Sequence, residues 1–288
     1  NEIKKELENE ISLETIFLKP VLKEMAKELD MSASVIKDTE KLPVLIKDDT
    51  PYEPFELTDM QQSYLIGRSG AFKLGDYSSH CYFEMDCDIL DRDRLENSWN
   101  EVIKIHDMMR AVVCDDNLHQ RVLEEVPHYE IKKIDLTELS GDALEESLLK
   151  IRHELEHQTF DLYKWPAYDI RYAEFGSRSR IFISFDNLFF DGWSMFYIFR
   201  QWKALYEDPD VRIDKADITF KEYVLSLNEN RKGESYEKDL EYWKNKLDNI
   251  SGAPELPVNK ESSVGTFKRF STHLKPEKWE ALKNKIRN

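Results

Sequence analysis

One stretch of this chain, residues 180–185, is almost wholly apolar, and it constrains the fold more than any other feature. Charged residues make up 34% of the sequence, so such a run predicts a strand that is buried on both faces at the centre of a sheet. A helix is predicted directly after it, from about Gly192 to Tyr206. A buried strand that leads into a helix is typical of layered α/β proteins.

Strands and helices are predicted to alternate along the chain from Phe55 onward. Further strands are expected at residues 81–85, 109–113, 119–123, 131–134, 170–175 and 267–274. Asp91 can cap a helix whose apolar face carries Leu95, Trp99, Val102 and Ile103. Other helices are expected at 220–227, at 236–247, after Pro276, and along the apolar stripe of Leu144, Leu148, Ile151 and Leu155. Together these elements predict a mixed sheet flanked by helices.

Residues 1–50 are predicted to form a separate helical linker or docking segment. Pro20 is well placed at the first turn of a helix, and apolar residues recur at helical spacing from Val21 to Leu29. The polar stretch 37–52 contains Pro43 and Pro51, which is typical of a linker. The chain begins with Asn1 rather than Met, which suggests an internal fragment of a longer protein.

Composition excludes several classes of partner. The formal net charge is −16, from 57 acidic and 41 basic residues, and such a surface repels the phosphates of nucleic acid. The apolar runs are too short to span a membrane, and the N-terminus has no apolar secretion signal. Cys81, Cys87 and Cys114 are odd in number and lack metal-type spacing, which predicts free thiols in a reducing cytoplasm.

The turn between the apolar strand and its helix carries the most informative polar residues. Residues 186–194, here called the signature loop, include Asp186, Asn187, Asp191 and Ser194. Open α/β sheets build sites where strands end, and a buried strand does not end in an unpartnered acid. The spacing leaves two interpretations open: Asp191 and Ser194 simply cap the helix while Asp186 forms a turn, or the group is a functional site. The aromatic residues that follow, Trp193, Phe196, Tyr197 and Phe199, are predicted to be core.

A second pattern, His153-Glu154-Leu155-Glu156-His157, matches the His-Glu-x-x-His motif of zinc enzymes, with Glu174 further on as a possible third ligand. The apolar stripe of this helix passes through Leu148, Ile151 and Leu155, so both histidines lie away from its buried face. The helix is also strongly acidic. We therefore predict that the histidines lie on a partly solvated face and bind no metal.

The spacing of Asp186, Asp191 and Ser194 resembles the Asp-x4-Asp-x2-Ser signature of heterocyclization (Cy) domains of nonribosomal peptide synthetases. Ordinary condensation domains carry His-His-x3-Asp-Gly at this loop, and Asn187 stands where their second, catalytic-type His would be. Other family motifs are matched in the same order over roughly 42–288, at residues 54–68, 106–110, 115–120, 165–171, 220–224, 242–243 and 253–257. Glu56 and Ser63 are mild departures from the opening motif. In the second motif, Ile105 replaces the leading Arg and Asn117 replaces a Gly.

The resemblance implies a chloramphenicol-acetyltransferase-like α/β fold. It divides the chain into a linker or docking segment (1–50), the N-terminal lobe of a cyclization domain (51–265) and the start of a second lobe or crossover (266–288). Such a domain condenses an acyl thioester with Cys, Ser or Thr and closes a thiazoline or oxazoline, in antibiotic or siderophore biosynthesis. Its partners are upstream and downstream carrier proteins and adjacent synthetase domains. Substrates arrive on phosphopantetheine, and no cofactor or metal is bound directly.

The resemblance also assigns roles within the signature loop. Asp186, Asp191 and Ser194 are the candidate catalytic residues, although structural roles are preferred for the two aspartates because no base partner is visible. Asn187 and Arg110 are candidate supporting residues, and we predict a buried bidentate pair between Asp191 and Arg110. Two rival interpretations stay open: an ordinary condensation domain or free acyltransferase, and a non-catalytic carrier-binding or scaffolding module.

Overall fold

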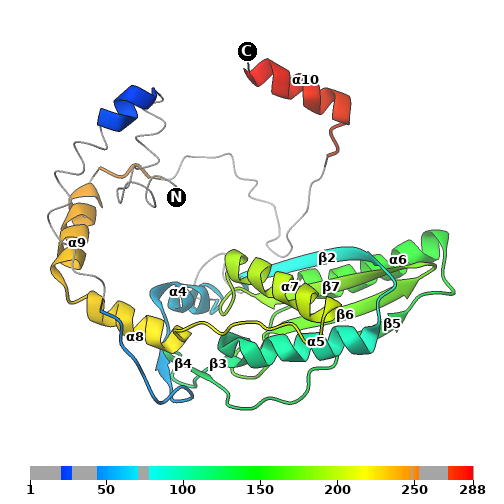
Figure 1. The fold of residues 1–288 in the computed structure, drawn as a ribbon, viewed down its shortest axis with the longest axis horizontal. Helices are drawn as coiled ribbons and strands as arrows, with labels where there is room; N and C mark the ends of the chain where they lie inside the picture. Colours follow the sequence, from blue (N-terminus) through cyan, green and yellow to red (C-terminus); the bar gives the residue numbers. More distant parts are fainter. Residues whose placement is uncertain (1–20, 28–43, 71–77, 248, 253–271, 288) are drawn as a thin grey trace.

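The computed structural model describes residues 21–27, 44–70, 78–247, 249–252 and 272–287 (Figure 1). Its main sheet has four strands in the order β2-β7-β6-β5. These are β2 (His80–Asp88), β7 (Arg178–Asp186), β6 (Tyr168–Phe175) and β5 (Lys132–Asp135). β7 pairs antiparallel with both β2 and β6, whereas β5 runs parallel to β6. The apolar run is therefore an interior strand, as predicted.

A smaller antiparallel sheet of three strands has the order β1-β4-β3. It consists of β1 (Phe55–Glu56), β4 (His119–Val122) and β3 (Ala111–Val113). The strand predicted at 109–113 is too long, because residues 107–110 form a short 3-10 helix, η1 (Asp107–Arg110). Helix α4 (Asp59–Gly67) follows β1 and begins at a capping box between Thr58 and Gln61.

Helices cover both faces of the main sheet. α5 (Arg92–Ile105) and α7 (Gly192–Glu207) pack on the face that carries Ile181, Ile183 and Phe185. α6 (Gly141–Glu156) packs on the opposite face, over Phe182. Successive strand residues point to opposite faces, so an apolar run with a helix layer on each side is buried throughout. The cap at Asp91 and the buried faces of α5 and α6 are confirmed.

Three more helices follow α7: α8 (Phe220–Asn230), α9 (Glu234–Leu247) and α10 (Pro276–Arg287). Residues 22–27 are helical, as predicted, but 1–20 and 28–43 lie outside the described residues. Most of the strand predicted at 267–274 also lies outside them, and residues 272–274 are not in a strand. In the part that the structure describes, no helix has the length and apolar character needed to cross a membrane. All three cysteines are free.

Part of the predicted linker is attached to α8 by hydrogen bonds. The side chain of Asn230 bonds both the amide and the carbonyl of Val44, and Ser226 accepts from the amide of Ile46. The buried ammonium of Lys221 lies 2.8 Å from a carboxylate oxygen of Asp48. These contacts hold residues 44, 46 and 48 against α8.

One ion-pair network links α6 to the sheet and makes a testable prediction. Glu84 on β2 bonds Arg152 of α6 at 2.7 Å and Arg180 of β7 at 2.8 Å. Burial is the largest single effect on the pKa of Glu84 and raises it, but the hydrogen bonds from Arg152 and Tyr82 and the charges of Arg152 and Arg180 together outweigh burial, so the pKa lies below its usual value of 4.5. Because the folded-state pKa is depressed, the network stabilises above pH 4.5 and loses its contribution as pH falls further.

We therefore expect Glu84→Gln to cost about 1–2 kcal/mol at pH 7 and less at pH 3, where protonation has begun to remove the contribution of this network. Urea unfolding of both proteins at the two pH values measures this. Glu101→Gln is the matched control, since Glu101 is half exposed and, among the residues that the structure describes, pairs only with the exposed Lys104. It should change stability by less than about 0.5 kcal/mol. An equal cost for Glu84→Gln at both pH values would contradict the prediction.

Candidate active site

Asp186 ends the central strand with a buried, fully bonded carboxylate. Its exposed fraction is 1%. One carboxylate oxygen accepts from the guanidinium of Arg68 and the hydroxyl of Ser78, both at 2.7 Å. The other accepts from the amide of Leu188 at 3.0 Å. Asp186 therefore holds the start of the signature loop, which is how a buried strand can end in an acid.

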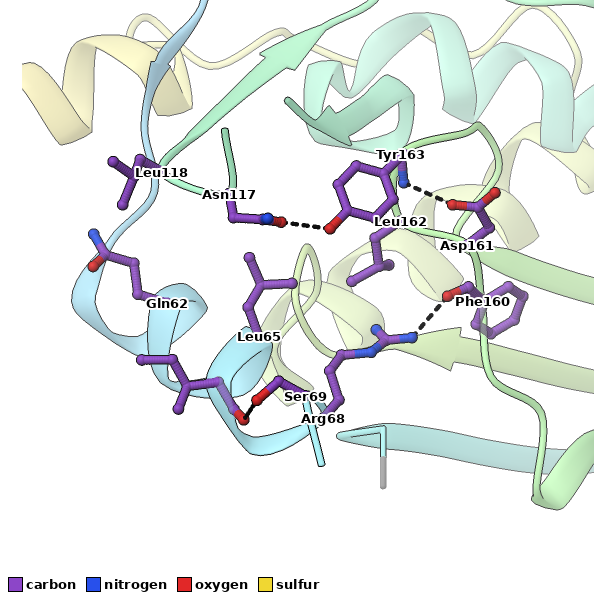
Figure 2. A pocket seen from close by; sticks show the side chains of 11 residues that line it. Gln62, Leu65, Arg68, Ser69, Asn117, Leu118, Phe160, Asp161, Leu162 and Tyr163 are labelled. Atoms are coloured by element: carbon purple, nitrogen blue, oxygen red, sulfur yellow. Dashed lines mark hydrogen bonds between the residues drawn. The ribbon is translucent and has the colours of Figure 1, made fainter. Parts of the chain in front are cut away.

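The cation that sequence reasoning missed is Arg68, which directly follows α4. Its second terminal nitrogen donates to the carbonyl of Phe160 at 2.7 Å (Figure 2). Arg68 thus joins α4, the end of β7 and the 160–163 loop. A buried acid at a strand end requires a cation or several donors, and the opening motif contains Gly67-Arg68, so the sequence did carry a signal for this pair.

Asp191 and Ser194 form the N-cap of α7. The Asp191 carboxylate accepts from the amide of Ser194 at 2.7 Å. Hydrogen bonds from the side chain and backbone of Ser194 lower the pKa of Asp191. The capping interpretation is therefore right about their geometry, and both residues are exposed at the start of the helix. The prediction that the following aromatic residues are core is wrong for Trp193, Phe196 and Tyr197, which are 82%, 70% and 42% exposed, and right for Phe199, which packs against the core.

The predicted pair between Asp191 and Arg110 is also wrong. Arg110 is buried, but its guanidinium donates to the carbonyls of Ile103, Lys104 and Leu123 and to the carboxylate of Asp107. Ile103 and Lys104 lie in the last turn of α5, whose free carbonyls and negative dipole end attract a cation. Arg110 therefore closes the end of α5 instead of reaching the signature loop.

Asn187 takes the position that a histidine holds in ordinary condensation domains. Its backbone N–H donates to the carbonyl of Ser79 at 2.8 Å. Its side-chain oxygen is buried and has no hydrogen-bond partner within the described residues. The next three residues, Leu188, Phe189 and Phe190, are buried, and Gln61 of α4 donates to the carbonyl of Leu188 at 3.1 Å. These contacts attach the loop to the residue before β2 and to α4.

Two cavities flank α4. The larger, about 1090 Å³, is lined by Gln61, Tyr64 and His106 together with Asn187, Asp191 and Ser194. The smaller, about 530 Å³, is lined by Leu65, Arg68, Phe160, Leu162 and Tyr163, whose hydroxyl bonds Asn117 (Figure 2). The larger has the size of a substrate site. Three of the five predicted site residues line it, whereas Asp186 and Arg110 do not.

The histidine pair lies at the end of α6. His153 is 74% exposed and His157 is 29% exposed, which confirms the partly solvated face. One carboxylate oxygen of Glu156 lies 3.6 Å from a ring nitrogen of each histidine. These three residues could supply ligand atoms to one ion, yet they do not form the enclosed ligand set of a structural or catalytic zinc site.

We therefore expect protein purified without chelators to carry no stoichiometric zinc, as measured by elemental analysis. Zinc titration followed by calorimetry should give at most weak binding that is equally weak in a His119→Ala control. Stoichiometric zinc that disappears in a His153→Ala, His157→Ala double variant would overturn the prediction.

Comparison with known proteins supports the class that the fold and the signature loop define. The family model of the condensation domain matches residues 53–288, and the chain belongs to this family. Bacitracin synthase 1 of Bacillus licheniformis is 28% identical over 99% of this chain, and the pyochelin synthetase PchF of Pseudomonas aeruginosa is 30% identical over 81%. The chain spans only 6% and 13% of these two proteins.

Solved structures point to the same branch of the family. The cyclization-docking bidomain of the synthetase EpoB from Sorangium cellulosum superposes with a TM-score of 0.74 at 27% identity. That match covers 92% of this chain and 55% of the bidomain. The synthetase FmoA3 superposes with a TM-score of 0.65 at 28% identity, over 76% of this chain. The chain is thus a condensation-type α/β domain segment similar to cyclization domains, with the mixed sheet that the sequence predicted.

Proposed function

We propose that this segment belongs to a heterocyclization domain of a nonribosomal peptide synthetase. Such a domain condenses a carrier-bound acyl thioester with Cys, Ser or Thr and then closes the side chain onto the new amide, giving a thiazoline or oxazoline. The observation that carries this proposal is the composition of the signature loop. Asp186 and Asn187 replace both histidines of an ordinary condensation domain, while Asp191 and Ser194 keep the cyclization pattern beside a substrate-sized cavity.

The same proposal specifies partners and setting. Upstream and downstream carrier proteins deliver both substrates on phosphopantetheine arms, and this segment needs no cofactor of its own. Residues 1–50 serve as the linker or docking segment, 51–265 as the N-terminal lobe and 266–288 as the start of the second lobe or crossover. We place the protein in the cytoplasm. The similarity to a cyclization-docking bidomain over 92% of the chain supports this division.

The test uses the full-length protein with carrier-loaded Cys, Ser and Thr and an acyl-loaded upstream carrier. Mass spectrometry of the released product distinguishes an open-chain amide from a heterocycle, which has lost one water. We expect a heterocycle with at least one of the three amino acids, and none from residues 1–288 alone, because the reaction tunnel of this family lies between two lobes. An open-chain amide from all three would favour ordinary condensation, and no product from any would favour a scaffolding module.

A further inference from the structure

His106 lies where α5 leads into η1 and lines the larger cavity together with Asn187 and Ser194. Its Nε2 is hydrogen-bonded to the side-chain oxygen of Gln201, a buried residue of α7. Its ring stands edge-on to that of Tyr197, with centroids 6.0 Å apart. Two contacts with one helix therefore fix both the position and the orientation of this imidazole.

The hydrogen bond to Gln201 also selects the tautomer. A side-chain amide oxygen can only accept, so Nε2 of a neutral His106 carries the proton and Nδ1 carries the free lone pair. Within the described part of the chain, Nδ1 has no hydrogen-bond partner. Burial lowers the pKa of His106, against the smaller opposing effects of Gln201 and Asp107. The ring is therefore kept as a neutral base at neutral pH.

The walls of this cavity carry more negative than positive charge. Four aspartates line it, with one lysine as the single cation among the lining residues: Asp107, Asp191, Asp214, Asp217 and Lys215. A concave surface with net negative charge attracts cations and repels anions. The amino group of an aminoacyl thioester is a cation at neutral pH until a base removes its proton.

We propose that the larger cavity takes the amine-bearing aminoacyl substrate and that His106 is the base that removes its proton. The inference rests on the proposed function. It assigns a base to the deprotonation of the amine, a step that the amide side chain of Asn187 in the signature loop cannot perform. In this acidic cavity, the bound ammonium ion is the acid that donates the proton and neutral His106 is the base that accepts it. Gln201 is the positioning residue, because it acts only through His106.

Nδ1 of His106 takes one proton from the ammonium and leaves a neutral amine, which attacks the carbonyl carbon of the upstream thioester. The C–N bond forms and the C–S bond breaks. The second proton lost by the nitrogen ends on the departing thiolate of the upstream arm, and His106 later releases its own proton to solvent. The products are an amide and a free pantetheine thiol.

The first test is His106→Gln in the full-length protein, which removes the base but keeps a polar side chain of similar length. We expect amide formation at pH 7 to fall about 100-fold or more, the contribution typical of general base catalysis. His119→Gln is the control: His119 pairs with Asp116 outside this cavity and should leave the rate unchanged. Thermal melting confirms that both variants fold.

Two outcomes distinguish a failure of the proposed function from a failure of the role of His106. If the unaltered protein forms neither amide nor heterocycle, the proposed function fails. If it forms product and His106→Gln forms it at the same rate, only the role of His106 is overturned.

A second variant, Gln201→Glu, tests the base without removing it. A carboxylate beside Nε2 raises the pKa of His106, so the acid limb of the pH–rate profile should move to higher pH. Asp107 and Tyr197 beside His106, and Arg200, whose guanidinium lies over the Tyr197 ring, are unchanged in this variant. So are the charged residues that line the same cavity: Asp191, Asp214, Lys215 and Asp217. An unshifted limb would contradict the proposal even if His106→Gln proves unstable.

Discussion

Asp186→Ala is expected to lower the free energy of unfolding by about 3–5 kcal/mol, the cost of breaking a buried ion pair from one side. The substitution leaves the Arg68 guanidinium, whose side chain is 13% exposed, without its carboxylate partner. It also removes the acceptor for Ser78 and for the amide of Leu188. Urea unfolding monitored by tryptophan fluorescence measures the change.

Asp191→Ala is the matched control, because it removes an aspartate from the same loop. Asp191 bonds the start of α7 and no cation within the described residues, so losing the cap should cost about 1 kcal/mol. Replacing both Arg68 and Asp186 by leucine should recover part of the loss, since no buried charge is then left alone. Equal costs for the two single aspartate variants would show that the Arg68 pair does not hold the signature loop.

Trp99→Ala is expected to cost a similar 3–5 kcal/mol, the usual range for deleting a buried tryptophan. Trp99 is fully buried on α5, and its ring meets Trp202 of α7, Tyr168 of β6 and Phe185 of β7 at centroid distances of 4.7, 5.6 and 6.1 Å. Phe185 directly precedes Asp186. The cavity left by this substitution therefore loosens both elements that bracket the signature loop.

Trp243→Ala provides the same change of side chain at an exposed site. Trp243 is 61% exposed on α9, so its removal should alter stability by less than about 0.5 kcal/mol. The two variants can be compared by denaturant midpoints at equal slope. A Trp99→Ala protein as stable as the Trp243→Ala protein would refute this account of the core.

Local periodicity was sufficient for most of the architecture. The interior position of β7 follows from its apolar run, and the buried faces of α5 and α6 follow from residues such as Trp99 and Leu155 that recur at helical spacing. These features depend on neighbours along the chain, which is why they can be read without coordinates. The boundary at η1 was missed because a 3-10 turn leaves no distinct hydrophobic pattern.

The residues of the signature loop could be named from their order, but their partners could not. Asp186 needed a cation, but the sequence assigned Arg110 to Asp191 and named no partner for Asp186. Only the folded chain brings Arg68, 118 positions away, to 2.7 Å, while Arg110 is taken by the carbonyls at the end of α5. His106 and Gln201 meet across 95 positions in the same way. Pairing between distant residues depends on how layers pack, and no spacing along one strand or helix encodes it.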